Sequence, residues 1–227
     1  MPIVWGSNDI VIDGLVLYID AKNPRCYPGS GTAVYDLSPR KNDGTLINNP
    51  PFSSEYGGSF TIPNTSPYIE LSKPASLPIG TSDRTVMAFC RTPSALSQSF
   101  MHVIHWGTPT ADQSFGIAVF SNGGLNTHPW VGAPSQGTVV ADRNYCLTVS
   151  YSSGLHKFWI NAVSQGAGVT RNINTGTTTA RIGVRISAPL EFWSPNGKIF
   201  SVLVYDRVLT DAEILKNYNS MKRRYGI

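Results

Sequence analysis

The sequence predicts an all-β fold: a two-sheet antiparallel sandwich with one short C-terminal helix. Apolar runs of strand length recur at about 8–15 residue spacing, separated by turn formers, which is typical of a sandwich. The 227 residues include 21 Gly and 16 Pro, which fits many short strands joined by turns. Charged residues make up 14% of the chain, against roughly 25% in an average soluble domain. Amides and hydroxyls are therefore expected to supply much of the polar surface.

The expected strands are short apolar runs. The run at 84–92, "RTVMAFCRT", alternates along its length, while "NYCLTVSY" and "HKFWINA" flank the turn formers Ser152, Ser153 and Gly154 and predict a hairpin. We find no internal repeat and no long linker, so we expect one domain. The other expected strands lie at 15–21, 99–107, 114–121, 180–186 and 197–209.

The end of the chain carries complete helix-start signals. Thr210 is a good N-cap, and Glu213 three positions later completes a capping box. Leu209 and Ile214 are placed to form a hydrophobic staple around that cap. An apolar stripe must then pack on the sandwich, and it consists of Ile214, Leu215, Tyr218 and Met221.

The cysteines and the N-terminus indicate in which cellular compartment the protein is made and folds. Cys26, Cys90 and Cys146 are odd in number and widely spaced, so neither a zinc framework nor a disulfide framework is expected. Cys90 and Cys146 fall inside strand-like runs, so we expect these two to be buried free thiols. The N-terminus lacks a signal-peptide pattern, and no apolar run approaches the ~18 residues that span a bilayer. We therefore expect synthesis and folding in a reducing cytoplasm.

Several segments in the right order resemble one family. "GKIFSVLVYDRVLTDAEILKNYN", "GLVLYIDAKNPRCYPGSGTAVYDLSPRKNDGTL", "DRNYCLTVSYSSGLHKFWINAVSQG" and "ARIGVR" are similar to segments of laminin-G-like, concanavalin A-like jelly-roll domains. This resemblance implies a jelly roll over residues 14–218. An N-terminal arm at 1–13 and a basic tail at 219–227 would flank it.

The start "GLVLYIDAKNPRCYPGSGT" and the end "ILKNYNSMKRRYG" also resemble segments of structural proteins of tailed bacteriophages. This implies a non-enzymatic virion protein, either a capsid decoration protein or another particle-surface protein. Its partners would be the major capsid protein, tail or fibre proteins, or further copies in a homo-oligomer; membranes and nucleic acid are not expected. The expected contact residues are Ile3, Val4, Trp5, Lys222, Arg223 and Arg224.

The sequence offers little for catalysis. A glucanase of this fold would need clustered carboxylates in an E-x-D-x-E strand, and the four glutamates are scattered instead. His102 and His105 stand three positions apart on an expected strand, so they should point to opposite faces unless a bulge intervenes. One buried and one exposed histidine are expected, and catalytic residues are not.

A calcium site would suit the family but is poorly supplied here. Calcium takes 6–8 oxygen ligands, including carboxylates. The relevant loop reads "PNTSPYI", in which Asn64 offers only an amide oxygen, while Asp36 and Asp43 are near in sequence alone. No cofactor is therefore expected.

The alternative function is a carbohydrate-binding lectin module, which could act as a tail-fibre or receptor-binding protein for a surface glycan. Such sites stack aromatic rings on sugars and bond the hydroxyls with amides or acids. The same tryptophans could instead plug the ends of the sandwich or contact a neighbouring subunit, which is the interpretation that the sequence favours. The candidate ligand-binding residues are Trp106, Asn122, His128, Trp130, Trp193 and Asn196.

Overall fold

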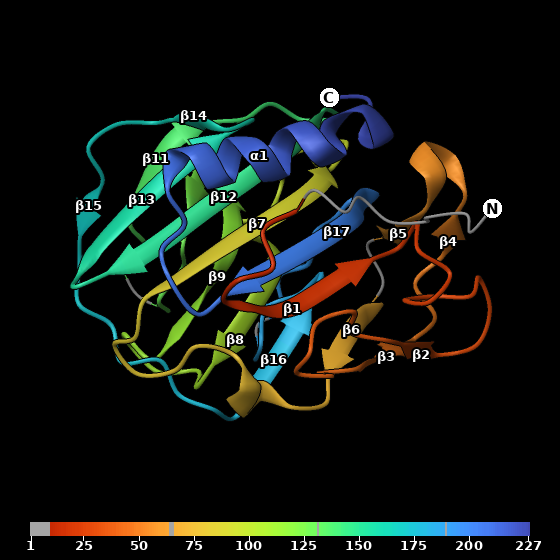
Figure 1. Cartoon of the computed structure of the whole chain (residues 1–227), viewed down its shortest axis with the longest axis horizontal. Helices are drawn as coiled ribbons and strands as arrows, with labels where there is room; N and C mark the ends of the chain where they lie inside the picture. The colour runs from red at the N-terminus through yellow and green to blue at the C-terminus, as the bar shows by residue number, and fades with distance from the viewer. Residues whose placement is uncertain (1–9, 64–65, 131, 189) are drawn as a thin grey trace.

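Two antiparallel sheets stacked face to face form the molecule (Figure 1). The computed structural model describes residues 10–63, 66–130, 132–188 and 190–227. Among them, the nine-stranded sheet runs β14 (Val163–Ser164), β13 (Leu155–Ile160), β12 (Asn144–Ser152), β7 (Arg84–Arg91), β17 (Gly197–Tyr205), β5 (Ser59–Ile62) and β4 (Phe52–Ser53). Outside this path, β1 (Leu15–Asp20) pairs with β17, and β15 (Val169–Thr170) pairs with β13.

The second sheet has eight strands in the described part of the chain and carries the candidate site. Its order is β11 (Ser135–Thr138), β10 (Gly124–Asn126), β9 (Ser114–Phe120), β8 (Phe100–Gly107), β16 (Thr179–Ile182), β6 (Tyr68–Leu71), β3 (Gly44–Ile47) and β2 (Ala33–Val34). The predicted fold class is confirmed. The predicted strand at 180–186 ends early, because Gly183 takes a left-handed φ of 90° that breaks the extended backbone.

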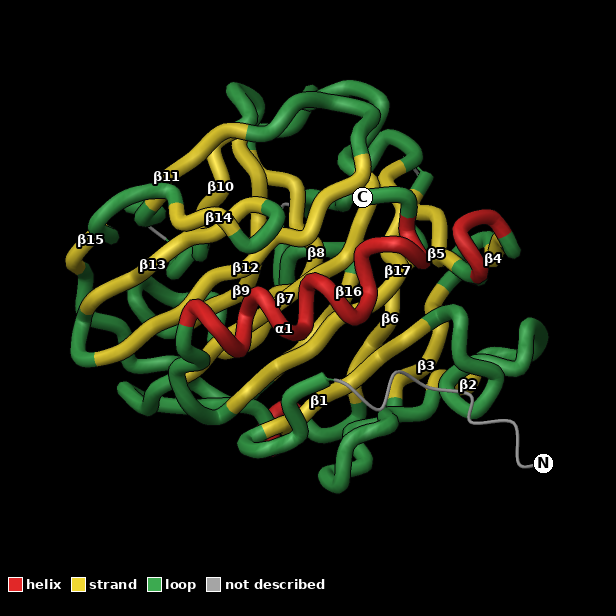
Figure 2. The backbone as a smooth tube through the Cα atoms, turned by 45° about the horizontal axis from the view of Figure 1, so that its top comes forward, coloured by secondary structure: helices red, strands yellow, loops and turns green. Residues whose placement is uncertain are grey.

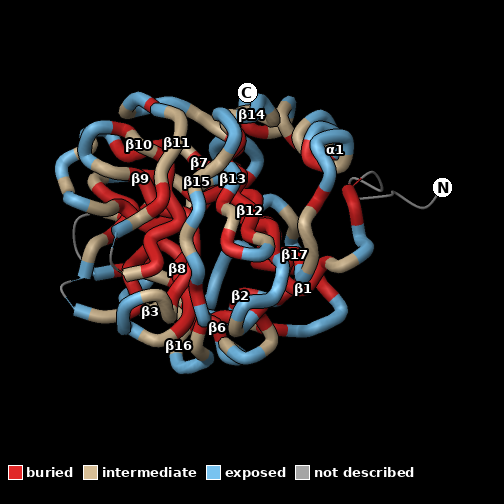
Figure 3. Tube along the Cα trace, turned by 90° about the vertical axis from the view of Figure 1, so that its left-hand side faces the viewer, coloured by how far each residue is buried: buried red, intermediate tan, exposed pale blue. Residues whose placement is uncertain are grey.

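The main core lies between the two sheets, where the strands are buried along most of their length (Figure 3). The predicted hairpin is the pair β12–β13, with Ser152 opposite Leu155. Its inward residues Leu147, Val149 and Phe158 are fully buried. All three cysteines are buried free thiols, as predicted for Cys90 and Cys146.

Helix α1 (Asp211–Met221) lies across the outer face of the nine-stranded sheet (Figure 2). Its capping box is as predicted: the Glu213 N–H donates to Thr210 Oγ1 at 3.3 Å, and the Thr210 N–H donates to Glu213 Oε2 at 2.9 Å. The predicted apolar stripe is wrong at Leu215, which is 48% exposed. Asn217 is buried in its place, because its amide accepts from the Val11 N–H and donates to the Tyr205 hydroxyl.

The last residues fold back onto the sandwich. The short 3-10 helices are η1 (Glu55–Gly57), η2 (Pro74–Ser76) and η3 (Lys222–Tyr225). Helix α1 runs past residue 218 directly into η3, whose Tyr225 is fully buried and stacks on Phe200 at 5.0 Å. Residues 219–227 are therefore part of the folded body, where the sequence suggested a separate tail.

Candidate functional site

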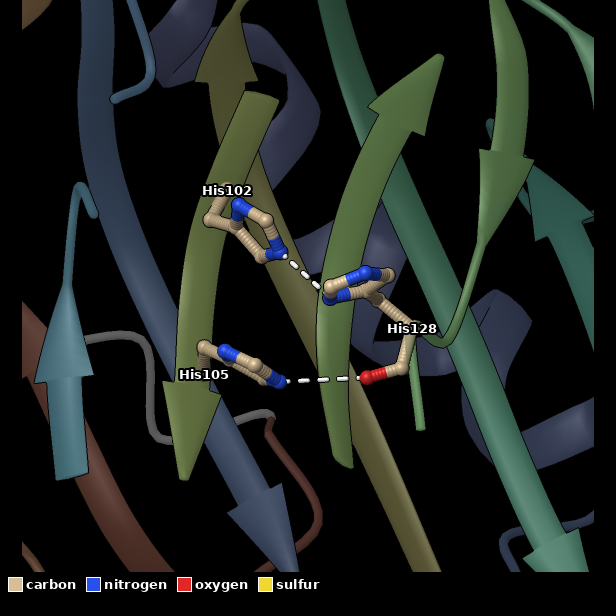
Figure 4. Close-up of side chains that lie close together, drawn as sticks. All are labelled: His102, His105 and His128. Atoms are coloured by element: carbon tan, nitrogen blue, oxygen red, sulfur yellow. Dashed lines mark hydrogen bonds between the residues drawn. The ribbon is translucent and has the colours of Figure 1, made fainter. Parts of the chain in front are cut away.

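Three of the chain's four histidines meet on the outer face of the eight-stranded sheet. We call His102, His105 and His128 the His cluster (Figure 4). His102 and His105 lie on β8, and their rings stack with centroids 4.7 Å apart. All three residues are buried, so the expectation of one buried and one exposed histidine is wrong.

A β-bulge explains why His102 and His105 share a face. On β9, His102 pairs with Ala118 whereas Ile104 pairs with Ile117, so Val103 is the extra residue. The extra residue changes the alternation of side chains and brings both rings to one side. Gly116 stands opposite His105, and a Cβ there would collide with the Ile104 carbonyl oxygen. A glycine within a strand is a known sign of a bulge. Gly116 is therefore the residue in the sequence that could have indicated this bulge.

Hydrogen bonds give each ring of the His cluster a defined tautomer. The Ile186 N–H donates to His105 Nδ1 at 3.4 Å, so His105 Nε2–H donates to the His128 carbonyl at 3.1 Å. His102 Nδ1–H donates to the Glu191 carbonyl at 3.3 Å, and its Nε2 accepts from His128 Nδ1–H at 2.9 Å. His128 Nε2 is then an acceptor with no partner among the described residues.

The surroundings keep the His cluster neutral. Burial, together with the smaller effect of the nearby Arg185 guanidinium, lowers the pKa of His128 to about 3. Burial likewise holds the pKa values of His102 and His105 well below the usual range for histidine. The rings therefore remain unprotonated bases at neutral pH.

The loop after β10 carries the chain from the His cluster to a partly exposed tryptophan. His128 and Trp130 both have left-handed backbone, with φ of 36° and 78°. For a bulky residue this conformation is strained by about 1–3 kcal/mol, and such strain gathers at functional sites. The Trp130 ring lies nearly parallel to that of His105, at 9° with centroids 6.4 Å apart.

Arg185 and Glu191 support that tryptophan, and together the three residues form what we call the Trp130 surface. The Arg185 guanidinium carbon lies 4.0 Å from the Trp130 ring centroid, which is a cation–π contact. Arg185 Nη1 pairs with Glu191 Oε2 at 3.0 Å, and both side chains are largely buried. An aromatic ring is thus held beside a paired acid and base.

A family model described as the concanavalin A-like lectin/glucanases superfamily, of laminin G type, matches residues 63–215. The chain belongs to this superfamily. The sequence-based resemblance to the domain is therefore confirmed, while the resemblance of the two termini to phage proteins stays a prediction. A search of curated proteins finds no match.

Solved structures of proteins with different roles share the fold of this chain. The isolated domain 4 of AbnA, a GH43 extracellular arabinanase from Geobacillus stearothermophilus in complex with arabinotriose, aligns at TM-score 0.64 and 13% identity, over 92% of this chain and 100% of that chain. The binding domain of botulinum neurotoxin DC, in complex with rat synaptotagmin II, aligns at TM-score 0.67 and 11% identity, over 93% of this chain and 52% of that one.

A sialidase from Trypanosoma rangeli in complex with sialic acid aligns at TM-score 0.64 and 13% identity, over 92% of this chain. The chain spans only 33% of that sialidase's length. At these identities all three likenesses show the fold alone.

The structure separates the predicted ligand-binding residues. Trp106 and Trp193 are fully buried, and their indole N–H groups donate to the carbonyls of Pro78 and Arg91, each at 2.9 Å. They fill the core of this concanavalin A-like sandwich and are not available to stack on a ligand. His128 is buried in the His cluster, which leaves Trp130 as the candidate tryptophan with part of its surface exposed.

Asn122 and Asn196 lie exposed in turns. The Asn122 amide oxygen accepts from the Gly124 N–H at 3.0 Å, and Asn196 has a left-handed φ of 56°. Neither side chain forms a hydrogen bond with Trp130, Arg185 or Glu191. Of these three residues, the sequence predicted Trp130 alone. Arg185 and Glu191 were missed because their roles depend on a loop that returns from β16 over the face of β8.

The predicted partner-contact residues differ in how available they are. Arg224 is not a free basic group, because its guanidinium pairs with the buried Asp20 carboxylate at 2.6 Å. Lys222 lies over the Tyr218 ring at 4.9 Å, and Arg223 is exposed. Ile3, Val4, Trp5 and the calcium candidate Asn64 lie outside the described residues.

The two aspartates considered for calcium and all four glutamates are already engaged. Asp36 is buried and accepts four hydrogen bonds, from the Tyr18, Ser38 and Asn42 N–H groups and the Ser38 hydroxyl, so its oxygens hold a loop and are not free for calcium. Asp43 caps the Asp36 N–H at 2.8 Å. Each glutamate pairs with a base: Glu55 with Lys198, Glu70 with Arg181, Glu191 with Arg185, and Glu213 with Arg207.

No helix in the described ranges is long and apolar enough to cross a bilayer.

Proposed function

We propose that the chain is a carbohydrate-binding module that holds an oligosaccharide against the Trp130 surface. The observation that carries this proposal is the geometry of Trp130: a partly exposed indole on strained backbone, fixed by Arg185 at 4.0 Å. Sugar sites combine an aromatic platform with a few placed polar groups, and Glu191 paired to Arg185 supplies such groups.

Membership of the lectin/glucanase superfamily supports this function. The AbnA domain gives further support, since it matches along its whole length and its structure holds arabinotriose. The role is non-enzymatic in our proposal, because a glycosidase needs a pair of carboxyl groups about 5–10 Å apart and each glutamate here is engaged by a base.

The test is a binding measurement with a panel of oligosaccharides that begins with arabinotriose. Trp130→Ala should weaken binding about fivefold or more, since stacking contacts of this kind are worth about 1 kcal/mol or more. Tyr35→Ala is the matched control, because Tyr35 is an aromatic residue 48% exposed on another part of the fold. Equal affinities for the wild type and a folded Trp130→Ala variant would contradict the proposal.

Attachment to a virion is a second proposal, and the resemblance of the two termini to phage proteins is what favours it. The pairing of Arg224 with Asp20 leaves Lys222 and Arg223 as the basic residues of that end that could meet a partner. Immunogold microscopy of purified particles tests the location. Label on the head would favour a decoration protein, label at the tail fibres would favour receptor binding, and unlabelled particles would contradict the virion role.

A further inference from the structure

We propose that the His cluster binds one zinc ion through one ring nitrogen from each of His102, His105 and His128. One ring nitrogen of each residue lies within 4.8 Å of those of the other two. Three nitrogens around a tetrahedral zinc at 2.0–2.1 Å would lie about 3.3 Å apart. His102 Nε2 and His128 Nδ1 are already 2.9 Å apart, so small rotations of the rings complete the set.

Figure 4 shows how the rings are aimed. His102 Nε2 and His105 Nε2 both point from β8 toward His128, which reaches back from the loop after β10. The Glu191 carbonyl accepts the proton of His102 Nδ1, which leaves the Nε2 lone pair free to face the other rings. This is the outer hydrogen bond that orients a metal-binding histidine.

One of the hydrogen bonds that zinc would replace is weak. The bond from the Ile186 N–H to His105 Nδ1 is 3.4 Å long, outside the usual 2.7–3.2 Å range. Moving the His105 proton from Nε2 to Nδ1 frees Nε2 for the metal and costs this contact and the bond to the His128 carbonyl. Moving the His128 proton from Nδ1 to Nε2 likewise frees Nδ1 and costs the 2.9 Å bond to His102 Nε2, and three metal–nitrogen bonds take the place of these contacts.

Two buried acceptors beside the rings lack a donor among the described residues. They are His128 Nε2 and Asn126 Oδ1, and both residues are almost fully buried. Asn126, Ala118 and His102 occupy adjacent register positions across β10, β9 and β8, so the amide shares the face of the His cluster. When zinc binds His128 Nδ1, the ring proton moves to Nε2, so this nitrogen is no longer an unpaired acceptor, and a water ligand of the zinc would supply a donor on the face that Asn126 shares.

The donor set selects the metal. The cluster offers neutral imidazole nitrogens, which suit zinc and similar transition ions, whereas calcium and magnesium take oxygen ligands. The nearby Arg185 charge is compensated by Glu191 at 3.0 Å, so an incoming cation does not meet an isolated positive charge. The ion would tie β8 to the loop of Trp130. The zinc proposal stands on the histidines alone, whether or not the Trp130 surface binds sugar.

The experiment uses the full chain without a histidine tag, stripped of metal by a chelator and then titrated with zinc chloride. We expect one zinc per chain by elemental analysis after desalting. The melting temperature should rise by several degrees when free zinc reaches about 100 times its Kd, with no rise in calcium. His105→Asn should weaken zinc binding about 100-fold. His156→Gln is the matched control, because His156 is the one histidine outside the cluster.

A second readout needs no variant. Long-range proton–nitrogen spectra of the wild-type imidazoles should show zinc shifting the ring nitrogens of three histidines while His156 stays unchanged. The proposal is overturned if His105→Asn, when folded, binds zinc as tightly as the wild type. It is equally overturned if excess zinc leaves His102 and His128 as Nδ1–H tautomers and His105 as the Nε2–H tautomer.

Discussion

Arg224 donates two hydrogen bonds to the Asp20 carboxylate, at 2.6 and 2.8 Å, and so joins the last turn of the chain to β1. Asp20 is buried and also accepts from the hydroxyls of Tyr18 and Tyr225, at 3.0 and 3.1 Å. Its carboxylate raises the pKa of Tyr225, although burial is the larger cause. This polar cluster explains why a basic C-terminal end folds against the sandwich.

Removing the Arg224 guanidinium should therefore destabilise the protein. Arg224→Met keeps the length of the side chain but leaves Asp20 as a buried charge without its partner, which costs about 3 kcal/mol. Urea unfolding measures the loss, and Arg223→Met is the control, because Arg223 is an exposed neighbour. Similar midpoints for the two variants would show that the pair contributes little.

The bulge in β8 should depend on Gly116. In Gly116→Ala the new methyl would overlap the Ile104 carbonyl oxygen, a backbone atom that cannot move without disturbing the strand. We expect a loss of about 2–3 kcal/mol in unfolding free energy, as in overpacked cores. Gly124→Ala is the control, since the atoms nearest its new methyl belong to side chains that can shift. A Gly116→Ala variant as stable as Gly124→Ala would contradict the close approach.

His156 should make stability depend on pH. Burial lowers its pKa from 6.5 to about 4, although its Nε2–H donates to the Arg171 carbonyl at 2.9 Å. Below about pH 6.5 His156 takes up a proton in the unfolded chain, whereas in the folded chain it stays neutral until the pH approaches 4. Stability is therefore lost as pH falls toward 4, at up to about 1.4 kcal/mol per pH unit.

His156→Gln keeps a donor but does not titrate, so its unfolding free energy should fall less steeply over that window than the wild type's. Urea titrations at several pH values between about 4.5 and 7.5 make the comparison. Parallel curves for the two proteins would contradict a neutral buried His156.

Local patterns in the sequence predicted the elements well, because their causes are local. The capping box of Thr210 and Glu213 lies within one turn, and the hairpin at Ser152 depends on neighbouring residues. The His cluster depends on an extra residue in β8 and on a loop from two strands away, so strict alternation predicted opposite faces for His102 and His105. Asp20 and Arg224 are 204 positions apart, and no local pattern pairs them.

The tryptophans also show that local sequence does not reveal which side chains the fold buries. Trp106 and Trp193 stand beside loop-like sequence, yet both are buried because their indole N–H groups reach backbone carbonyls inside the fold. Trp130 is distinguished by its left-handed backbone and by Arg185, neither of which the sequence displays. The sandwich was thus predictable in outline, and the choice among candidate residues required the packing.

The central claim is that Trp130 contacts an oligosaccharide, and the indole N–H signals of the chain's five tryptophans test it most directly. A proton–nitrogen spectrum is recorded while arabinotriose and other oligosaccharides are added to the wild-type protein. We expect the Trp130 signal to move until it saturates, while the signals of Trp106 and Trp193 stay in place because both rings lie inside the core. If every sugar leaves the Trp130 signal unmoved, or a ligand that binds shifts other signals only, the account of this site is wrong.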